Sequence, residues 1–134
     1  MSALAVTRDD ASAPFYDAAT RGELLLRRCA DCVHWAAPRA VACPACGSAR
    51  LTWEPARGDA TLVSWTVVHG RPPAEGGEAP RTVAGLVELA EGPWLHGRLT
   101  GVADPGSLTC GQRLVLAFER PGGGEAVPVF RPAL

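Results

Sequence analysis

The chain has 134 residues, of which 47% are hydrophobic and 20% are charged, and its formal net charge at pH 7 is -1. This length suits one domain or two very small ones and argues against a large enzyme with a self-contained active site. The balanced charge and a pI near 6.3 argue against a basic surface that binds nucleic acid or an anionic membrane. No apolar run approaches the roughly 20 residues that a membrane-spanning helix needs.

The first thirteen residues lack a basic start followed by a sustained apolar stretch, so they do not predict a secretory signal. We therefore expect a cytoplasmic protein, in a compartment that keeps thiols reduced. Four of the five cysteines form CxxC pairs. In that compartment such pairs indicate a metal site before they indicate disulfides.

The first predicted element is a short helix that begins at Ser12 and is ended by Gly22. Ser12 is a favourable N-cap residue, and Asp17 is an acidic residue early in the helix. We interpret the adjacent aromatic residues Phe15 and Tyr16 as packing residues, because aromatic side chains most often fill cores. The leucines that follow read as a short strand that leads into the first cysteine, so residues 12–28 form a helical segment with a lead-in strand.

Residues 29–54 are predicted to be a zinc ribbon. Ten residues separate the two CxxC pairs, Cys29/Cys32 and Cys43/Cys46. Each pair bends the chain into a knuckle, and two knuckles supply four thiolates in a tetrahedron, for which Zn²⁺ is the usual occupant. Four thiolates leave no position open for water or substrate, so we expect a structural metal rather than a catalytic one.

The cysteine pattern is also compatible with a second metal. The sequence Cys-Pro-Ala-Cys-Gly also occurs in rubredoxins, where four thiolates hold a redox-active iron, so electron transfer is a rival interpretation of the site. His34 follows the first knuckle but is not needed as a ligand, since the four cysteines complete the site. The fifth cysteine, Cys110, is interpreted as a small buried residue rather than a reactive thiol.

Residues 55–132 contain five segments with strand character, separated by Gly and Pro clusters that are typical of turns. Five short strands in this length predict a small closed barrel of the OB-fold type. Leu114, Leu116 and Phe118 share one face and are predicted to lie in the core, as is Trp65. The predicted strands are 60–69, 81–89, 94–100, 113–119 and 126–131.

The third predicted strand places Trp94, His96 and Arg98 on one face and leucines on the other. We expect the leucine face to point inward. The outward row could bind a nucleotide-like ligand or another protein, and solvent exposure alone is the simpler alternative. His69 and Arg71 emerge into the long loop at 70–80, a common place for ligand contacts. We assign no catalytic residues, because no nucleophile elbow, phosphate loop or dinucleotide fingerprint is present.

The order of these parts resembles the family of zinc-ribbon OB-fold proteins associated with acyl-CoA metabolism, first known as a domain of unknown function. The resemblance spans nearly the whole chain, from about Pro14 to Arg131. Its motifs are Arg21-Gly22-Glu23-Leu24, the paired knuckles, Ser64-Trp65-Thr66-Val67-Val68-His69, Ala84-Gly85-Leu86-Val87-Glu88-Leu89, Glu91-Gly92-Pro93, Gly101-Val102 and Val129-Phe130-Arg131-Pro132. One departure is Val33, which follows Cys32 where such a knuckle often has glycine.

The resemblance implies a mainly β protein with a short N-terminal helix, a rubredoxin-like zinc ribbon and a C-terminal five-stranded OB-fold barrel. It further implies a non-catalytic accessory subunit that binds acyl-CoA or completes the site of a partner, which would be a thiolase-like enzyme or a hot-dog-fold hydratase in a hetero-oligomer. The candidate ligand-binding residues near the CoA moiety are then Trp65, His69, Arg71, Trp94, His96 and Arg98.

Two alternatives stay open at this point. Zinc ribbons and OB barrels both occur in nucleic-acid-binding modules, although the acidic pI and few aromatic residues count against that role. A scaffold that binds a partner and no small ligand fits everything except the resemblance. The sequence does not identify the acyl chain, the partner or the stoichiometry.

Overall fold

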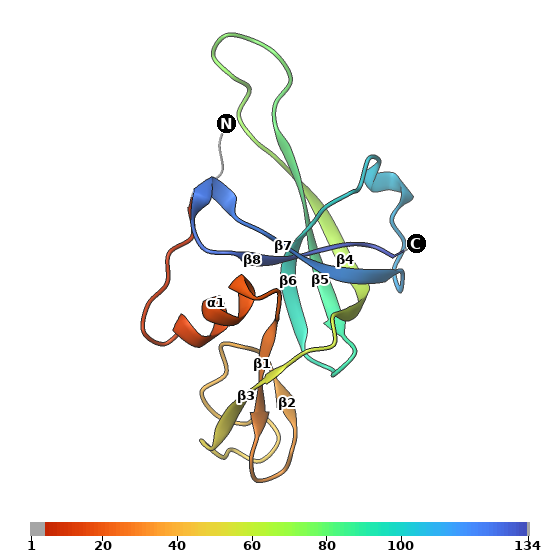
Figure 1. Cartoon of the computed structure of the whole chain (residues 1–134). Coiled ribbons are helices and arrows are strands. Elements are labelled where there is room, and N and C mark those ends of the chain that lie inside the picture. Colours follow the sequence, from red (N-terminus) through yellow and green to blue (C-terminus); the bar gives the residue numbers. More distant parts are fainter. Residues whose placement is uncertain (1–4, 134) are drawn as a thin grey trace.

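The computed structural model describes residues 5–133 as one short helix, a small sheet and a barrel (Figure 1). The small sheet has the strand order β2-β1-β3, and the barrel is closed in the order β4-β5-β6-β8-β7. The mainly β fold class with a five-stranded barrel is therefore confirmed. The elements are α1 (Ala13–Thr20), β1 (Leu25–Cys29), β2 (Trp35–Ala36), β3 (Leu51–Pro55), β4 (Asp59–His69), β5 (Arg81–Leu89), β6 (Trp94–Leu99), η1 (Pro105–Ser107), β7 (Arg113–Glu119), η2 (Pro121–Gly123) and β8 (Val127–Pro132).

Helix α1 begins and ends where the sequence predicts, with Ser12 at its N-cap position and Gly22 just past its end. At its end, Gly22 has φ +79°, the Gly22 amide donates to Ala19 and the Glu23 amide donates to Ala18, which is a Schellman motif. At its start, Ser12 makes no side-chain cap. Its backbone N–H and Oγ instead donate to Oδ1 of Asp9, at 2.8 and 2.7 Å, so the Ser12 hydroxyl is engaged before the helix begins.

The first helical turn contains no acidic residue. The Asp17 carboxylate lies further along and accepts a hydrogen bond from Arg8. Arg8 also donates through two nitrogens to Glu125, at 2.7 and 2.9 Å. The segment before the helix is thereby fastened to the loop before β8. A Cβ on Gly124 in that loop would lie 2.6 Å from the Val6 oxygen, so the close approach requires glycine.

The ribbon sheet stacks arginines on tryptophans. Arg27 in β1 pairs with Trp53 in β3, and its guanidinium lies 4.2 Å from the indole centroid. Arg28 pairs with Trp35 in β2, with a corresponding distance of 4.7 Å. These contacts are cation–π interactions, and they explain why the charged residues of this strand are half-buried. Leu26 in β1 and Leu24 just before it are fully buried, and both belong to the same hydrophobic core as the barrel.

All five predicted barrel strands are present within a residue or two of their predicted ends. The core is built from side chains of every barrel strand. Phe130 and Leu114 are among its fully buried members, and Leu116 and Phe118 pack against it while half-buried. Between β6 and β8 the barrel closes through a single parallel pair, Leu99 with Phe130. No helix among residues 5–133 is long and apolar enough to cross a membrane.

A bulge in β4 changes which side chains face inward. The pairing of β4 with β5 shifts between Leu62 and Ser64, so one residue is skipped. Strict alternation would put Leu62 and Trp65 on opposite faces, but the shift lets both belong to the core side, with Trp65 half-buried against it. Trp65 pairs with Gly85, whose missing side chain leaves room for Leu99; a Cβ there would lie 2.8 Å from Leu99 Cδ2.

Candidate metal centre and adjoining groove

The two CxxC knuckles have matching backbone geometry. In the first, the Cys29 amide donates to His34 and the Val33 amide donates to Cys29, at 2.9 and 3.0 Å. In the second, the Cys43 amide donates to Ser48 and the Gly47 amide donates to Cys43, both at 2.8 Å. Val33 and Gly47 occupy equivalent positions with φ of +60° and +79°. A β-branched residue in this left-handed region is strained, so the departure seen in the sequence is a strained turn.

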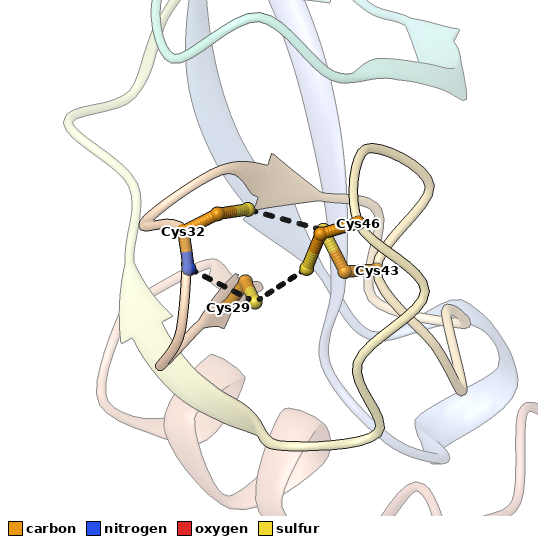
Figure 2. A group of neighbouring side chains, drawn as sticks. All are labelled: Cys29, Cys32, Cys43 and Cys46. Atoms are coloured by element: carbon orange, nitrogen blue, oxygen red, sulfur yellow. Dashed lines mark hydrogen bonds between the residues drawn. The ribbon is translucent and has the colours of Figure 1, made fainter.

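The four sulfurs fit a tetrahedral metal site (Figure 2). All four lie within 4.8 Å of one another, with Cys29 Sγ 3.6 Å from Cys46 Sγ and Cys32 Sγ 3.5 Å from Cys43 Sγ. Zn–S bonds of about 2.3 Å in a tetrahedron put sulfurs about 3.8 Å apart. Backbone amides point at the sulfurs as well, since those of Asp31 and Cys32 both lie 3.4 Å from Cys29 Sγ. The geometry and the soft donor set fit zinc.

The pKa values of the thiols diverge because backbone amides and neighbouring sulfurs act on them unequally. A hydrogen bond from the Cys32 amide lowers the pKa of Cys29 to about 7. The Ser48 amide acts in the same direction on Cys46, but hydrogen bonds with Cys29 and Cys32 outweigh it and raise the pKa of Cys46 to about 12. Four thiolates this close therefore require a cation among them, because like charges at this distance do not ionise together.

A polar brace joins the knuckles outside the sulfur cluster. The Asp31 carboxylate, in the first knuckle, accepts hydrogen bonds from the Ser48 hydroxyl at 2.5 Å and from the Arg50 guanidinium at 2.6 Å. Both donors follow the second knuckle. His34 is exposed and lies outside the sulfur cluster, in keeping with its exclusion as a ligand. Cys110 is exposed in the turn before β7, so the prediction that it is buried is wrong; the residue begins a tight turn rather than the strand.

A groove of about 980 Å³ lies where the N-terminal segment, the ribbon and the barrel meet. Trp94, Leu95 and His96 of β6 and Pro128 of β8 contribute its barrel wall. The Trp94 indole is 53% exposed, and its N–H donates to Glu88 at 2.9 Å, which fixes the ring. The remaining lining residues are Thr7, Asp9, Ala11, Ser12, Phe15, Tyr16, Arg27, Ala37, Pro38, Arg39, Ala40, Val41 and Trp53.

The structure separates the six candidate ligand-binding residues. Trp94 and His96 lie together in the groove, whereas Arg98 pairs with Glu119 at 2.8 Å and does not line it. Trp65 packs against the barrel core, His69 is exposed at the end of β4, and Arg71 lies in the loop at 70–80, which projects away from the ribbon in Figure 1. His69 pairs with Arg81, and Trp94 pairs with Glu88 at the other end of β5. These ends are about 23 Å apart at ~3.3 Å per residue.

Sequence reasoning missed the groove residues outside the barrel. Arg27, Arg39 and Trp53 are not among the ligand-binding residues that the sequence predicts, although all three line the groove. Tyr16 was interpreted as packing, and it does contact Phe15 edge-on at 5.2 Å, but it also lines the groove. The missing signal was the strand at 51–55, because only its pairing with β1 places the indole of Trp53 against Arg27.

Comparisons with known proteins agree with this architecture. Two family models match, the ChsH2 rubredoxin-like zinc ribbon domain over residues 17–52 and the ChsH2 C-terminal OB-fold domain over residues 53–119. A solved structure of an Ltp2-ChsH2(DUF35) aldolase contains a chain that is 34% identical, with a TM-score of 0.78 over 98% of this chain and 99% of that one. A DUF35 protein of unknown function from Sulfolobus solfataricus, 14% identical over 92% of this chain and 86% of its own, has a TM-score of 0.64 and supports the fold alone.

A curated relative extends the comparison to a longer protein. The probable enoyl-CoA hydratase alpha subunit of Thermomonospora curvata is 37% identical over 130 residues. The match covers 97% of this chain but only 39% of that protein, so the relative carries a further region that this chain does not match. Together with the two matched domains and the four clustered cysteines, these likenesses show that the chain belongs to the ChsH2 (DUF35) family of zinc-ribbon OB-fold proteins.

Proposed function

We propose that this chain is a non-catalytic, cytoplasmic accessory subunit of a hetero-oligomeric enzyme complex that acts on acyl-CoA thioesters. The observation that carries the proposal is the whole-chain likeness to the ChsH2 chain of an aldolase complex. The name of the Thermomonospora relative, an enoyl-CoA hydratase subunit, points to the same class of substrate. The partner would be a thiolase-like enzyme or a hot-dog-fold hydratase, and the ribbon and α1 would contact it.

In this proposal the metal orders the chain and takes no part in the reaction. Cys29, Cys32, Cys43 and Cys46 would hold Zn²⁺ with no open coordination position. The bound ion would fix the loop at 37–41, which forms one wall of the groove. A ribbon of this size cannot bury a core of its own, so its shape depends on the metal and on the shared leucines of the lead-in strand.

The groove is the favoured place for acyl-CoA. Arg27 and Arg39 bring two guanidinium groups to it, which suit the phosphates of CoA, and Tyr16, Trp53 and Trp94 supply aromatic rings for the adenine. Its volume lies in the range of sites that hold ligands of this size. Of the six predicted ligand-binding residues, Trp94 and His96 would therefore contact acyl-CoA in this groove. The loop that contains Arg71 and follows His69 would not contact the ligand there.

Isothermal titration of acyl-CoA into the zinc-loaded chain and into its reconstituted complex tests the ligand. We expect binding that weakens about tenfold in Arg39→Ala, since a hydrogen bond to a charged group contributes about 1.5 kcal/mol or more. Arg113→Ala is the matched control, because Arg113 is exposed at the start of β7 and does not line the groove. Absence of acyl-CoA binding in both preparations, or salt-dependent binding of single-stranded oligonucleotides in its place, would contradict the proposal.

A further inference from the structure

The barrel wall is open beside the groove. Within residues 5–133, β6 pairs with β5 along its whole length, from Trp94 to Leu99, but with β8 at Leu99 alone. From this pair toward the N-terminal ends of β6 and β8, the two strands therefore diverge. Residues from both sides of the opening, Trp94, Leu95 and His96 on one side and Pro128 on the other, line the groove. The edge of β6 is thus exposed to whatever the groove binds.

The direction of the free backbone groups follows from one hydrogen bond. The Thr100 amide donates to the Phe130 carbonyl at 2.8 Å, so Thr100 directs its backbone groups toward β8. The N–H and C=O of alternate residues in a strand point to the same side. His96 and Trp94 have the same parity as Thr100, so they also direct an N–H and a C=O away from β5 and into the opening.

The facing strand offers no donor there. Phe130 accepts from β6, and Pro128 has the same parity, so its backbone nitrogen also faces the opening. Any other residue at position 128 would direct an unpaired N–H into the opening, but proline has no N–H. The free hydrogen-bonding groups of the opening therefore belong to β6. They are the N–H and C=O groups of Trp94 and His96, in the order in which an edge strand presents them to an added strand.

We infer that the edge of β6 between Trp94 and His96 binds the pantetheine arm of the ligand through its amides. This inference rests on the proposed function and specifies the subsite within the groove. Pantetheine is an extended chain with two secondary amides separated by two methylene carbons. Laid along β6, one amide N–H donates to the Trp94 carbonyl and the following amide carbonyl accepts from the His96 N–H, as an added strand would.

The arrangement divides the groove between the two halves of CoA. The arm lies along the edge of β6 beside Leu95, and the nucleotide lies toward Arg27 and Arg39. Free CoA and a carrier protein both present the same arm. Only CoA adds the 3′-phosphorylated nucleotide that the two arginines would contact, so comparing the two ligands distinguishes the sources.

The test compares His96→Pro with His96→Ala in the zinc-loaded full chain. Both variants lose the imidazole, but only proline removes the N–H that faces the groove. We expect His96→Pro to bind CoA about fivefold more weakly than His96→Ala, the effect of one hydrogen bond. Equal affinity of the two variants would overturn the inference.

A second measurement on the unmodified ¹⁵N-labelled chain avoids any effect of proline on folding. Pantetheine, 4′-phosphopantetheine and CoA are each expected to shift the amide resonance of His96. CoA alone is expected to shift the guanidinium resonances of Arg27 and Arg39 as well. If 4′-phosphopantetheine shifts these guanidinium resonances as much as CoA does, the ligand is the phosphopantetheine arm of a carrier protein and not CoA. CoA that binds without moving the His96 amide would overturn the β6 subsite and leave the proposed function standing. No binding of any of the three ligands, by the chain or its complex, would refute both.

Discussion

The matched knuckles allow the strain at Val33 to be measured directly. Val33 and Gly47 occupy the same position in the two turns, with φ of +60° and +79°. A non-glycine residue in the left-handed region costs about 1–3 kcal/mol. Replacing it with glycine also adds freedom to the unfolded chain, which offsets about 0.4–1 kcal/mol. The Val33 side chain is 62% exposed, so little burial is lost. Val33→Gly should therefore stabilise the metal-bound ribbon by about 1 kcal/mol.

The reverse substitution provides the control. A Cβ on Gly47 would meet nothing within 4 Å, so Gly47→Val tests the backbone conformation without a steric clash. We expect it to destabilise the ribbon by a similar amount, and the double variant to lie near the original chain. Because folding and metal binding are coupled in such ribbons, about 1 kcal/mol corresponds to about fivefold in zinc affinity.

Competition with a chromogenic chelator, with zinc affinity measured for all four proteins, gives the magnitudes. We expect about fivefold tighter binding for Val33→Gly and about fivefold weaker binding for Gly47→Val. Equal or weaker zinc binding by Val33→Gly would refute the strain argument. It would mean that the isopropyl group makes a stabilising contact that outweighs the cost of the turn.

Three further outcomes are expected. Leu24→Ala, in the lead-in strand, should cost about 3 kcal/mol in urea unfolding of the barrel, because this fully buried leucine belongs to the common core; unchanged barrel stability would contradict the common core. Gly85→Ala should cost about 1–3 kcal/mol in the same assay, through its clash with Leu99, and full stability would show that Leu99 adapts freely. Because the Arg8 hydrogen bond lowers the pKa of Glu125, this contact stabilises the N-terminal segment above the ordinary glutamate pKa and is lost as pH falls through the lowered value. The hydrogen-exchange protection factors of residues 5–12, corrected for the intrinsic rate at each pH, should therefore fall in acid in the original chain and be low already at neutral pH in Arg8→Ala. An Arg8→Ala segment as protected as the original at neutral pH would contradict this.

The fold was predictable where local patterns carry the information. Cysteine spacing specified the ribbon, and the alternation of residues 94–99 correctly assigned Leu95 and Leu99 to the inward face. The bulge after Leu62 was not predictable, because it changes the parity of the first barrel strand and no single residue type marks it. Cys110 was placed in the core from its residue type alone, whereas the turn before β7 exposes it.

The candidate site was only partly predictable for a different reason. Its metal ligands lie close together in sequence, so spacing was sufficient. The groove is assembled from segments far apart, with Trp53 reaching Arg27 across the ribbon sheet and Trp94 joining them from the barrel. Sequence parity could place Trp94 and His96 on one face, but it could not show that His69 lies at the far end of the neighbouring strands.

Native mass spectrometry of the tagged chain, gently purified from its own host, tests the central claim most directly. We predict one zinc ion per chain and a stoichiometric partner enzyme of the thiolase or hydratase type. A zinc-bearing chain that is recovered alone, or one that carries nucleic acid, would contradict the accessory-subunit account.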